Sequence, residues 1–140
     1  MQIIVETRVD APLEAVWGGW TTPESIKLWS VASEGWHTPH AEVDLQPGGR
    51  FLYRMEAEDG SAGFDFEGVY SAVVPMRKLV QTLADDREIK IEFVDEPHGI
   101  IVRKTFDADP STPIHVQRGG WQAILDNFKR FVEEGTQKAA

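Results

Sequence analysis

The sequence predicts an α+β fold, in which a curved antiparallel sheet of about six or seven strands surrounds one long C-terminal helix. Three observations support this prediction. Residues 40–106 contain short runs in which apolar and polar side chains alternate, which is the period of half-buried strands. Short turns rich in glycine, proline or aspartate separate these runs, and strands joined by such turns pair antiparallel. Residues 114–135 instead carry apolar side chains at helical spacing.

The first 30 residues predict one strand followed by two short helices. Residues 2–9 alternate with the strand period, and the stretch "DAPLEAVWGGW" then changes to helical spacing. Pro12 suits the first position of the first helix, which should end near Trp20 because two glycines weaken it. In "TTPESIKLWS", Thr22 can cap the second helix and Pro23 can occupy its first position. We expect both helices to lie across the opening between the sheet and the long helix.

The stretch "LQPGGRFLYRM" contains two adjacent glycines, which cradle a phosphate in some proteins and bend the chain in others. A phosphate loop needs a helix after it, so that free N–H groups and the helix dipole face the anion. Here a strand follows. Pro47 presets the second position of a type II turn, and Gly48 supplies the positive φ of its third position. We therefore predict a hairpin turn between two strands.

Four further strands and one helix complete the chain. The strands are predicted at residues 64–70, 78–83, 88–94 and 100–106. The inward stripe of the long helix is Trp121, Ile124, Leu125, Phe128 and Val132. Gly135 is a natural end for this helix, and "RGG" at 118–120 either starts it or lets it approach the sheet closely. A strongly curved sheet cannot fill all the space around a single helix, so we expect an apolar pocket between them.

The composition restricts the class of function. A chain of 140 residues is most simply one domain, spanning residues 1–140. The formal net charge of -9 argues against nucleic acid and anionic membrane as partners, because both bind basic surfaces. No apolar stretch approaches the roughly 20 residues of a membrane span, so no membrane insertion is expected. The chain has no cysteine for disulfide or thiolate chemistry, and its N-terminus lacks the pattern of a signal peptide, so we expect a cytoplasmic protein.

Four stretches of the sequence resemble a known family: "VDAPLEAVWGGWTTPESIKLWS", "VDLQPGGRFLYRM", "FEGVYSAVVPMRKLVQT" and "GGWQAILDNFKRFVE". They are similar to the activator of Hsp90 ATPase homologue 1-like domain of the START-like superfamily, which also holds polyketide cyclases and the birch-pollen allergen group. The resemblance implies the helix-grip fold, with a ligand cavity between the sheet and the long helix. Members of the superfamily bind lipids, sterols, polyketides, hormones or aromatic metabolites, and some are enzymes. The resemblance therefore does not by itself imply chaperone activation.

Aromatic and apolar residues dominate the candidate ligand-binding site. Trp20, Trp29 and Trp36 lie in or after the short helices that should cover the cavity mouth. The central strands and the long helix supply the other apolar candidates, which are Phe51, Tyr53, Met55, Phe66, Tyr70, Trp121 and Leu125. All of them are also compatible with core packing. The two interpretations differ only in whether protein side chains fill the space between these aromatic rings or leave it open for a ligand. The two tyrosine hydroxyls could orient a ligand or donate a proton.

Arg103 is the charged candidate. It shares strand parity with Ile101 and Thr105, and an inward arginine would bind a carboxylate or a phenolate. The alternative is that Arg103 faces outward and pairs with neighbouring acids, as most strand arginines do. Asp65 and Glu67 would form an inward carboxylate pair only if the neighbouring phenylalanines pointed outward, so we expect these two acids in solvent.

His37 and His40 do not predict a metal site. Pro39 between them disfavours the helix that would place both imidazoles on one face, and no acid–histidine spacing matches a metal-binding pattern. Either histidine could still act as a general acid or base at a pocket rim. The sequence contains no nucleophile–base motif and no nucleotide-binding loop, so the catalytic residues of any reaction stay unassigned, and we expect no metal and no cofactor.

The sequence thus favours non-covalent binding of a small hydrophobic or aromatic molecule in the cavity. Two alternatives stay open. One is a cyclase or lyase that acts in the same cavity, which an inward His or Tyr next to an Arg would favour. The other is a protein-interaction module acting on a chaperone, which an exposed apolar patch above a filled cavity would favour. A homodimer is compatible with the sequence.

Overall fold

The computed structural model describes residues 2–31 and 34–139 and has the predicted α+β helix-grip architecture. Seven strands form one antiparallel sheet in the order β1-β7-β6-β5-β4-β3-β2. The strands are β1 (Gln2–Val9), β2 (Trp36–Val43), β3 (Arg50–Ala57), β4 (Gly63–Val74), β5 (Lys78–Leu83), β6 (Glu88–Glu96) and β7 (Gly99–Asp107). The helices are α1 (Leu13–Thr21), α2 (Pro23–Trp29) and α3 (Ile114–Ala139).

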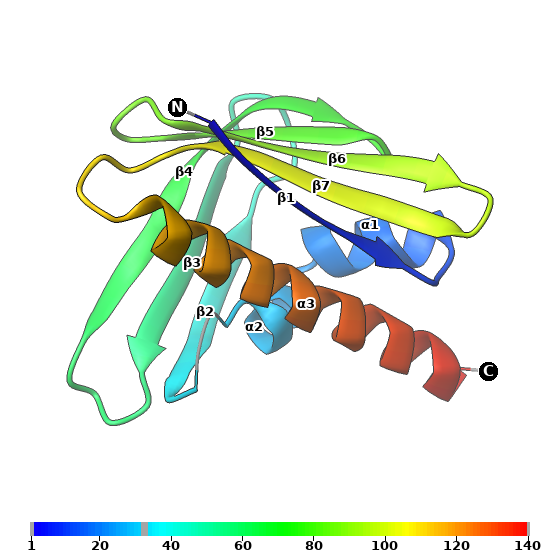
Figure 1. The fold of residues 1–140 in the computed structure, drawn as a ribbon, viewed down its shortest axis with the longest axis horizontal. Helices are drawn as coiled ribbons and strands as arrows, with labels where there is room; N and C mark the ends of the chain where they lie inside the picture. Colours follow the sequence, from blue (N-terminus) through cyan, green and yellow to red (C-terminus); the bar gives the residue numbers. More distant parts are fainter. Residues whose placement is uncertain (1, 32–33, 140) are drawn as a thin grey trace.

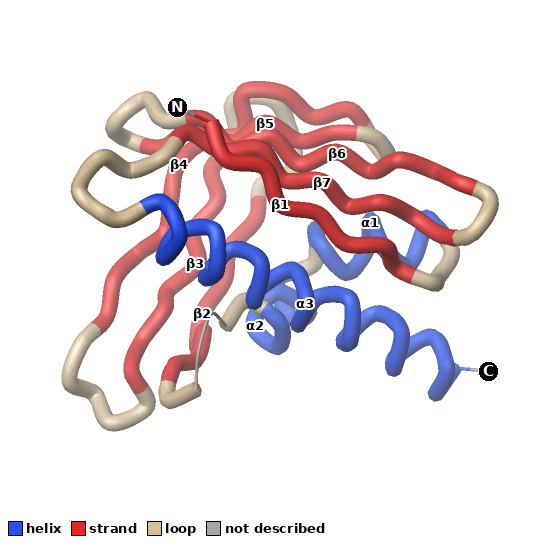
Figure 2. The backbone as a smooth tube through the Cα atoms, in the orientation of Figure 1, coloured by secondary structure: helices blue, strands red, loops and turns tan. Residues whose placement is uncertain are grey.

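The sheet curls around α3. Figure 1 shows β1, β5, β6 and β7 as one wing and β2 and β3 as the other, with α3 running across the concave side. The long strand β4 passes from one wing to the other. Figure 2 shows the two short helices beside the C-terminal half of α3, so they close one end of the space that the sheet encloses. The N-terminal turns of α3 lie at the opposite end, near β4.

The bend of the sheet is concentrated in β4. Its register against β5 shifts between Tyr70 and Ala72, and an irregularity of this kind bends a strand. Gly68 lies just before the shift, and a Cβ atom at this position would be 2.2 Å from the carbonyl oxygen of Thr82 on β5. Only glycine permits such a close approach of two backbones. Gly68 therefore allows β4 to stay paired with β5 through the bend.

The Pro-Gly-Gly stretch is a hairpin turn between β2 and β3, as predicted. Gly48 has a φ of 83°, the positive value that the third position of a type II turn requires. The Gly49 N–H donates to the Gln46 carbonyl at 2.8 Å, and the Gly48 N–H donates to the Tyr70 carbonyl at 2.7 Å. These donors bind backbone oxygens of the protein, so the turn does not resemble an anion cradle.

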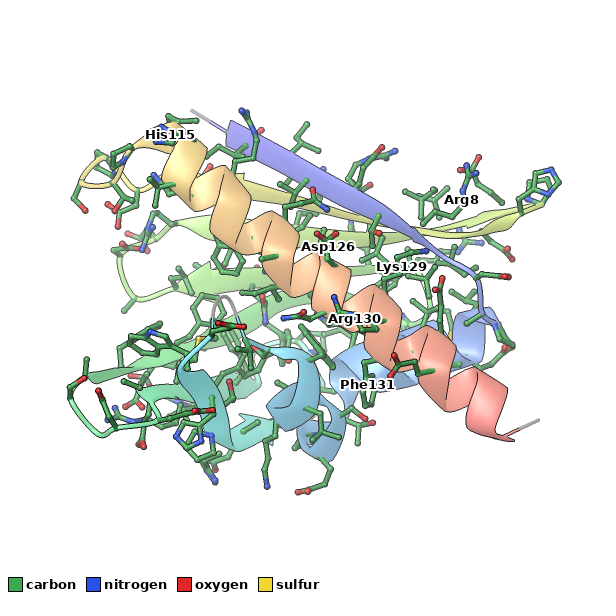
Figure 3. The ribbon with its side chains drawn as sticks, turned by 60° about the horizontal axis from the view of Figure 1, so that its bottom comes forward. Arg8, His115, Asp126, Lys129, Arg130 and Phe131 are labelled. Carbon is green, nitrogen blue, oxygen red and sulfur yellow. The ribbon has the colours of Figure 1, made fainter. Side chains whose placement is uncertain are left out.

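Each wing directs its apolar side chains toward the helices. On β3, Phe51, Tyr53 and Met55 are buried, whereas the residues between them are half-buried. The inward stripe of α3 is buried as predicted from Ile124 onward, and it consists of Ile124, Leu125, Phe128 and Val132. The opposite side of α3 is polar, and Figure 3 shows Asp126, Lys129 and Arg130 along it. The core therefore lies between α3 and the concave side of the sheet.

Two predictions about α3 are wrong. The helix does not end at Gly135 but continues to Ala139, because a glycine inside a helix is only weakly unfavourable. The "RGG" stretch neither starts α3 nor brings it close to the sheet. The helix begins earlier, at Ile114, and a Cβ atom at Gly119 or Gly120 would meet nothing within 4 Å.

Smaller differences occur in the first third of the chain. Pro12 is the N-cap residue of α1 rather than its first helical residue, and the Thr22 side chain makes no capping hydrogen bond, although Pro23 does start α2. Strand β2 begins at Trp36, earlier than predicted. Its register shifts after His37, where the sequence contains a proline, and an edge strand tolerates a proline because it pairs on one side only.

Candidate functional site

Three aromatic rings from three helices fill the interior between the short helices and α3. Trp20 of α1, Trp29 of α2 and Phe128 of α3 form a triangle with centroid separations of 4.5, 4.8 and 4.9 Å. The indole N–H of Trp29 donates to the Gly19 carbonyl at 2.9 Å, which satisfies its buried donor. We call these three residues the inner cluster. Trp20 and Trp29 are thus buried among protein side chains, at the end of the fold that the short helices close.

A second set of rings covers the concave side of the sheet and the start of α3. Phe66 is central to it, with ring centroids 5.6 Å from Phe51, 5.7 Å from Tyr53 and 5.7 Å from Trp121. Phe106 of β7 lies 5.3 Å from Trp121, so the contact continues from one wing of the sheet to the other. We call this set the wall cluster, and its members are Phe51, Tyr53, Phe66, Tyr70, Phe106 and Trp121.

A cleft of about 400 Å³ opens beside the wall cluster, between β4, the β5–β6 turn and the first turns of α3. Phe66, Phe106 and Trp121 form its aromatic wall. Its charged lining residues are Arg87 and four carboxylates, which are Asp65, Glu67, Asp85 and Asp107. Pockets of this size that combine aromatic walls with a few polar groups are typical of small-molecule sites. The cleft is therefore the candidate functional site.

The sequence-predicted candidates divide between this cleft and the rest of the core. Phe66 and Trp121 line the cleft directly, and the candidates Phe51, Tyr53 and Tyr70 belong to the same wall cluster. Three others lie apart from it. Leu125 and Met55 are buried core residues, and Trp36 is half-buried at the start of β2, with its ring 6.0 Å from Phe64.

Arg103 does not face the interior. Its Nε donates to the Glu6 carboxylate at 2.9 Å across the outer side of the β1–β7 pair. The inward orientation considered for Arg103 is wrong, because β7 directs the other parity inward, with Ile100, Val102 and Phe106 buried. Arg103 is therefore not part of the cleft.

Lys104 occupies the inward position that Arg103 does not. The residue is 4% exposed, and its Nζ lies 3.5 Å from the ring centroid of Trp121 and 5.7 Å from that of Trp20. Lys104 thus lies between the wall cluster and the inner cluster. Burial lowers the pKa of Lys104 well below its usual value, because desolvation disfavours the ammonium form. Among residues 2–31 and 34–139, none accepts a hydrogen bond from Nζ or forms an ion pair with it.

The sequence contained a signal for Lys104 and Phe106, which were not among the predicted site residues. Ile100, Val102, Lys104 and Phe106 share one parity of β7, and three of these four side chains are apolar. This parity is more apolar than the one that carries Arg103. A lysine inside such a stripe indicates an inward charge.

Several buried polar atoms near the two clusters have no partner in the described part of the chain. By strict hydrogen-bond geometry they are Trp20 Nε1, the Tyr53 hydroxyl oxygen and Gln81 Nε2, although Tyr53, Tyr70 and Gln81 lie close enough to influence one another. Burial raises the pKa of Tyr53 well above its usual value and raises the pKa of Tyr70 to about 12. Both hydroxyls therefore stay protonated at neutral pH and can donate hydrogen bonds. Because buried polar groups normally have partners, unpaired atoms of this kind fit a water molecule or a ligand oxygen.

The other polar candidates fall into two groups: Asp65 and Glu67 line the rim of the cleft, whereas His37 and His40 lie outside it. Asp65 and Glu67 pair with arginines of β3 on the outer side of the sheet, as expected. His37 and His40 lie on the edge strand β2, next to glutamates. In the described ranges, no group of three or more His, Cys, Asp or Glu residues is arranged to hold a metal ion. No helix among these residues is long and apolar enough to cross a membrane.

A larger hollow of about 770 Å³ lies at the other end of the molecule, between the β6–β7 turn, the start of α1 and α3. Arg8 and Lys129, both labelled in Figure 3, line it. Its cations have partners, since Arg8 lies 3.7 Å from Glu96 and Lys129 lies 2.7 Å from Glu133. We assign the functional site to the smaller cleft, because that cleft is aromatic and adjoins a cation without a carboxylate partner.

Comparison with protein families matches residues 10–133 to the family model described as Activator of Hsp90 ATPase homolog 1-like protein. A comparison with curated proteins finds no match. The match to the family model includes every strand and helix except β1 and the end of α3.

Solved structures from bacteria have the same fold. An AHSA1-like protein from Aeromonas hydrophila is 46% identical, with a TM-score of 0.90 over 96% of this chain and 94% of that chain. The protein Chr148 from Cytophaga hutchinsonii is 39% identical, with a TM-score of 0.83 over 97% and 94% of the two chains. A protein from Nitrosomonas europaea is 22% identical, with a TM-score of 0.85 over 100% and 97%, which shows the fold alone.

Proposed function

The chain belongs to the Activator of Hsp90 ATPase homolog 1-like family, and we propose that it binds a small, flat apolar or aromatic molecule in the cleft beside the wall cluster. The observation that carries this proposal is the position of Trp121. Its ring joins Phe66 of β4 to Phe106 of β7, so that sheet and helix together present one aromatic surface to the cleft. Aromatic rings stack favourably at centroid separations of roughly 4.5–7 Å, and such a surface selects flat ligands.

The inner cluster limits the size of the ligand. Trp20, Trp29 and Phe128 occupy the space along the second half of α3, where a long acyl chain would otherwise extend. The open volume of about 400 Å³ lies at the lower end of the range of roughly 300–1,000 Å³ that small-molecule pockets span. This arrangement favours a compact ring system over a lipid tail.

Ligand titration of the whole chain tests the proposal. Intrinsic tryptophan fluorescence and the melting temperature are followed across aromatic acids, aromatic amides, polycyclic metabolites and fatty acids. We expect saturable quenching and a rise in melting temperature with compact aromatic compounds, because a ligand that binds only the native state stabilises it. Replacing Trp121 with Phe should remove most of the fluorescence change, since its ring forms part of the cleft wall.

Two matched substitutions locate the binding site. Ala84 lines the cleft and Ala62 does not, although both are exposed alanines in loops between strands. We expect Ala84→Trp to weaken binding by filling the cleft and Ala62→Trp to leave it unchanged. A folded protein that responds to no compound, or a response that Ala84→Trp leaves intact, would contradict the proposal.

A further inference from the structure

We propose that the ligand carries an acidic group, a carboxylate or a phenolate, and that this group pairs with the ammonium of Lys104. The inference rests on the proposed function, because it concerns the chemistry of a ligand bound in the same cleft. It adds a substrate class, small aromatic acids, and a residue that selects this class.

The first argument is the missing counter-charge. Lys104 is the only charged residue among the buried residues of the described part of the chain. Buried ammonium groups are normally paired, because removing an isolated charge from water is strongly unfavourable. The Trp121 ring compensates the charge only in part, since a ring quadrupole attracts a cation far less strongly than a carboxylate does.

The second argument is position. Lys104 lies two residues from Phe106 on the same side of β7, and two residues of a strand span about 7 Å. Phe106 and Trp121 line the cleft, while Lys104 rests on the Trp121 ring. A flat molecule that enters along Phe106 and displaces the edge of the Trp121 ring therefore directs its inner end toward Nζ. The ring of such a ligand contacts the wall cluster, and its acidic substituent meets the ammonium.

The third argument is the donor character of the neighbouring polar atoms. Trp20 Nε1 is buried, can only donate a hydrogen bond and has no partner in the described residues, and its ring lies 5.7 Å from Lys104 Nζ. The Tyr53 hydroxyl and Gln81 Nε2 have no well-formed hydrogen bond either, although they lie close enough to interact with each other and with Tyr70, and Tyr53 retains its proton. Surroundings rich in unused donors fit a ligand group rich in acceptors. A carboxylate offers about four acceptor positions and no donor, whereas an amide of the same shape brings N–H groups of its own.

A matched pair of probes tests the inference. Naphthoate and naphthamide share one ring system and differ in the acidic group, and calorimetry measures the affinity of each for the whole chain. Charged hydrogen-bonded pairs are worth about tenfold or more in affinity, so we expect wild type to bind the acid at least about tenfold more tightly than the amide. Lys104→Met should abolish this preference. Arg103→Met should keep the preference, because Arg103 is the sequence neighbour of Lys104 but lies on the outer side of β7.

The outcomes separate this inference from the proposed function. Equal affinities of wild type for both probes would overturn the inference and leave cleft binding intact, and this measurement does not depend on the folding of any variant. A preference for the acid that persists in Lys104→Met, with the variant folded by circular dichroism, would also overturn it. Binding of neither probe, nor of any compound in the wider titration, would contradict the proposed function itself.

Discussion

The ammonium nitrogen of Lys104 lies 3.5 Å from the ring centroid of Trp121, and this contact joins β7 to α3 beside the aromatic cleft. Each residue fixes the position of the other: the ring covers the buried cation, and the cation contacts one face of the ring. A ligand that moves the ring therefore also changes the surroundings of the cation. We therefore expect a replacement of Lys104 to change the free energy of unfolding, the pH dependence of that free energy and the affinity for ligand.

Replacing Lys104 with Met should stabilise the protein without ligand. The substitution keeps an unbranched side chain that is one atom shorter, removes a desolvated ammonium and forfeits a cation–π contact worth about 0.5–2 kcal/mol. Apolar replacements of buried ion pairs are often neutral or stabilising by about 1–4 kcal/mol. A buried charge without a partner has less to compensate its desolvation, so we expect a net gain of about 1–2 kcal/mol. Urea unfolding at neutral pH measures it as a higher midpoint with an unchanged slope.

The control for this substitution is Lys90→Met, because Lys90 is a lysine of the neighbouring strand whose side chain is 44% exposed. Its removal should change the free energy of unfolding by less than about 0.5 kcal/mol. A marked loss of stability in Lys104→Met would show that the ammonium is well compensated in the free protein, contrary to its interpretation as an unpaired charge.

The pH dependence of stability should also depend on Lys104. Because the native pKa of Lys104 is lowered below its usual 10.5, the unfolded chain binds this proton more readily than the native protein does between the two pKa values. Stability relative to Lys104→Met should therefore rise with pH in this interval, by at most about 1.4 kcal/mol per pH unit. Below the native pKa, the difference between the two proteins should become constant.

Measuring the difference between wild type and Lys104→Met removes the contributions that both proteins share. The raised pKa values of Tyr53 and Tyr70 act in the opposite direction, since above about pH 10 the unfolded tyrosines ionise first and stability falls. The four neighbours of Lys104 that the strand pairing and the ring contacts identify do not titrate: Val5 on β1, Ile91 on β6, Trp20 on α1 and Trp121 on α3. Parallel pH profiles would contradict the lowered pKa.

The ion pair between Arg103 and Glu6 should contribute little to stability. Both side chains are more than a third exposed, at 39% and 51%, and exposed pairs are typically worth about 0.2–1 kcal/mol. We expect Arg103→Met to lower the free energy of unfolding by less than about 1 kcal/mol. The loss should shrink between about 0.1 M and about 1 M salt, because salt screens exposed charges. A larger, salt-independent loss would mean that the side chain packs against the sheet rather than acting through its charge.

Alternation along the strands predicted the fold well, because each strand of a one-sided sheet repeats the same two-residue pattern. Phe51, Tyr53 and Met55 on β3 are buried as this pattern predicts. The same rule failed at β7, where both parities contain apolar residues and only the pairing with β1 and β6 decides which side faces α3. The pattern of alternation therefore indicated Arg103, which faces outward, and missed Lys104, the buried lysine that follows it.

The depth of the cleft could not be predicted from the sequence for a different reason. Trp20, Trp29 and Trp36 are all aromatic residues near the short helices, and nothing local distinguishes a ring that lines a pocket from one that fills it. The stacking of Trp20 and Trp29 on Phe128 depends on where α3 lies, and Phe128 is 108 and 99 residues further along the chain. Contacts of such long sequence separation leave no mark in the local pattern.

Two glycine substitutions should change stability in opposite directions. At Gly68 an added Cβ would lie 2.2 Å from the Thr82 carbonyl oxygen, so Gly68→Ala must push β4 away from β5 at the bend. We expect a loss of about 2–3 kcal/mol, since such overpacking typically destabilises by about 1–3 kcal/mol. At Gly119, in the second turn of α3, an added Cβ meets nothing within 4 Å, and Gly119→Ala should stabilise the helix by about 0.5–1 kcal/mol.

Urea unfolding of the two single variants and the double variant measures both changes in the free energy of unfolding, which should add because the sites share no contact. If Gly68→Ala were as stable as wild type, β4 and β5 would not approach as closely as the structure has them, and the cleft that β4 helps to form would have a different width.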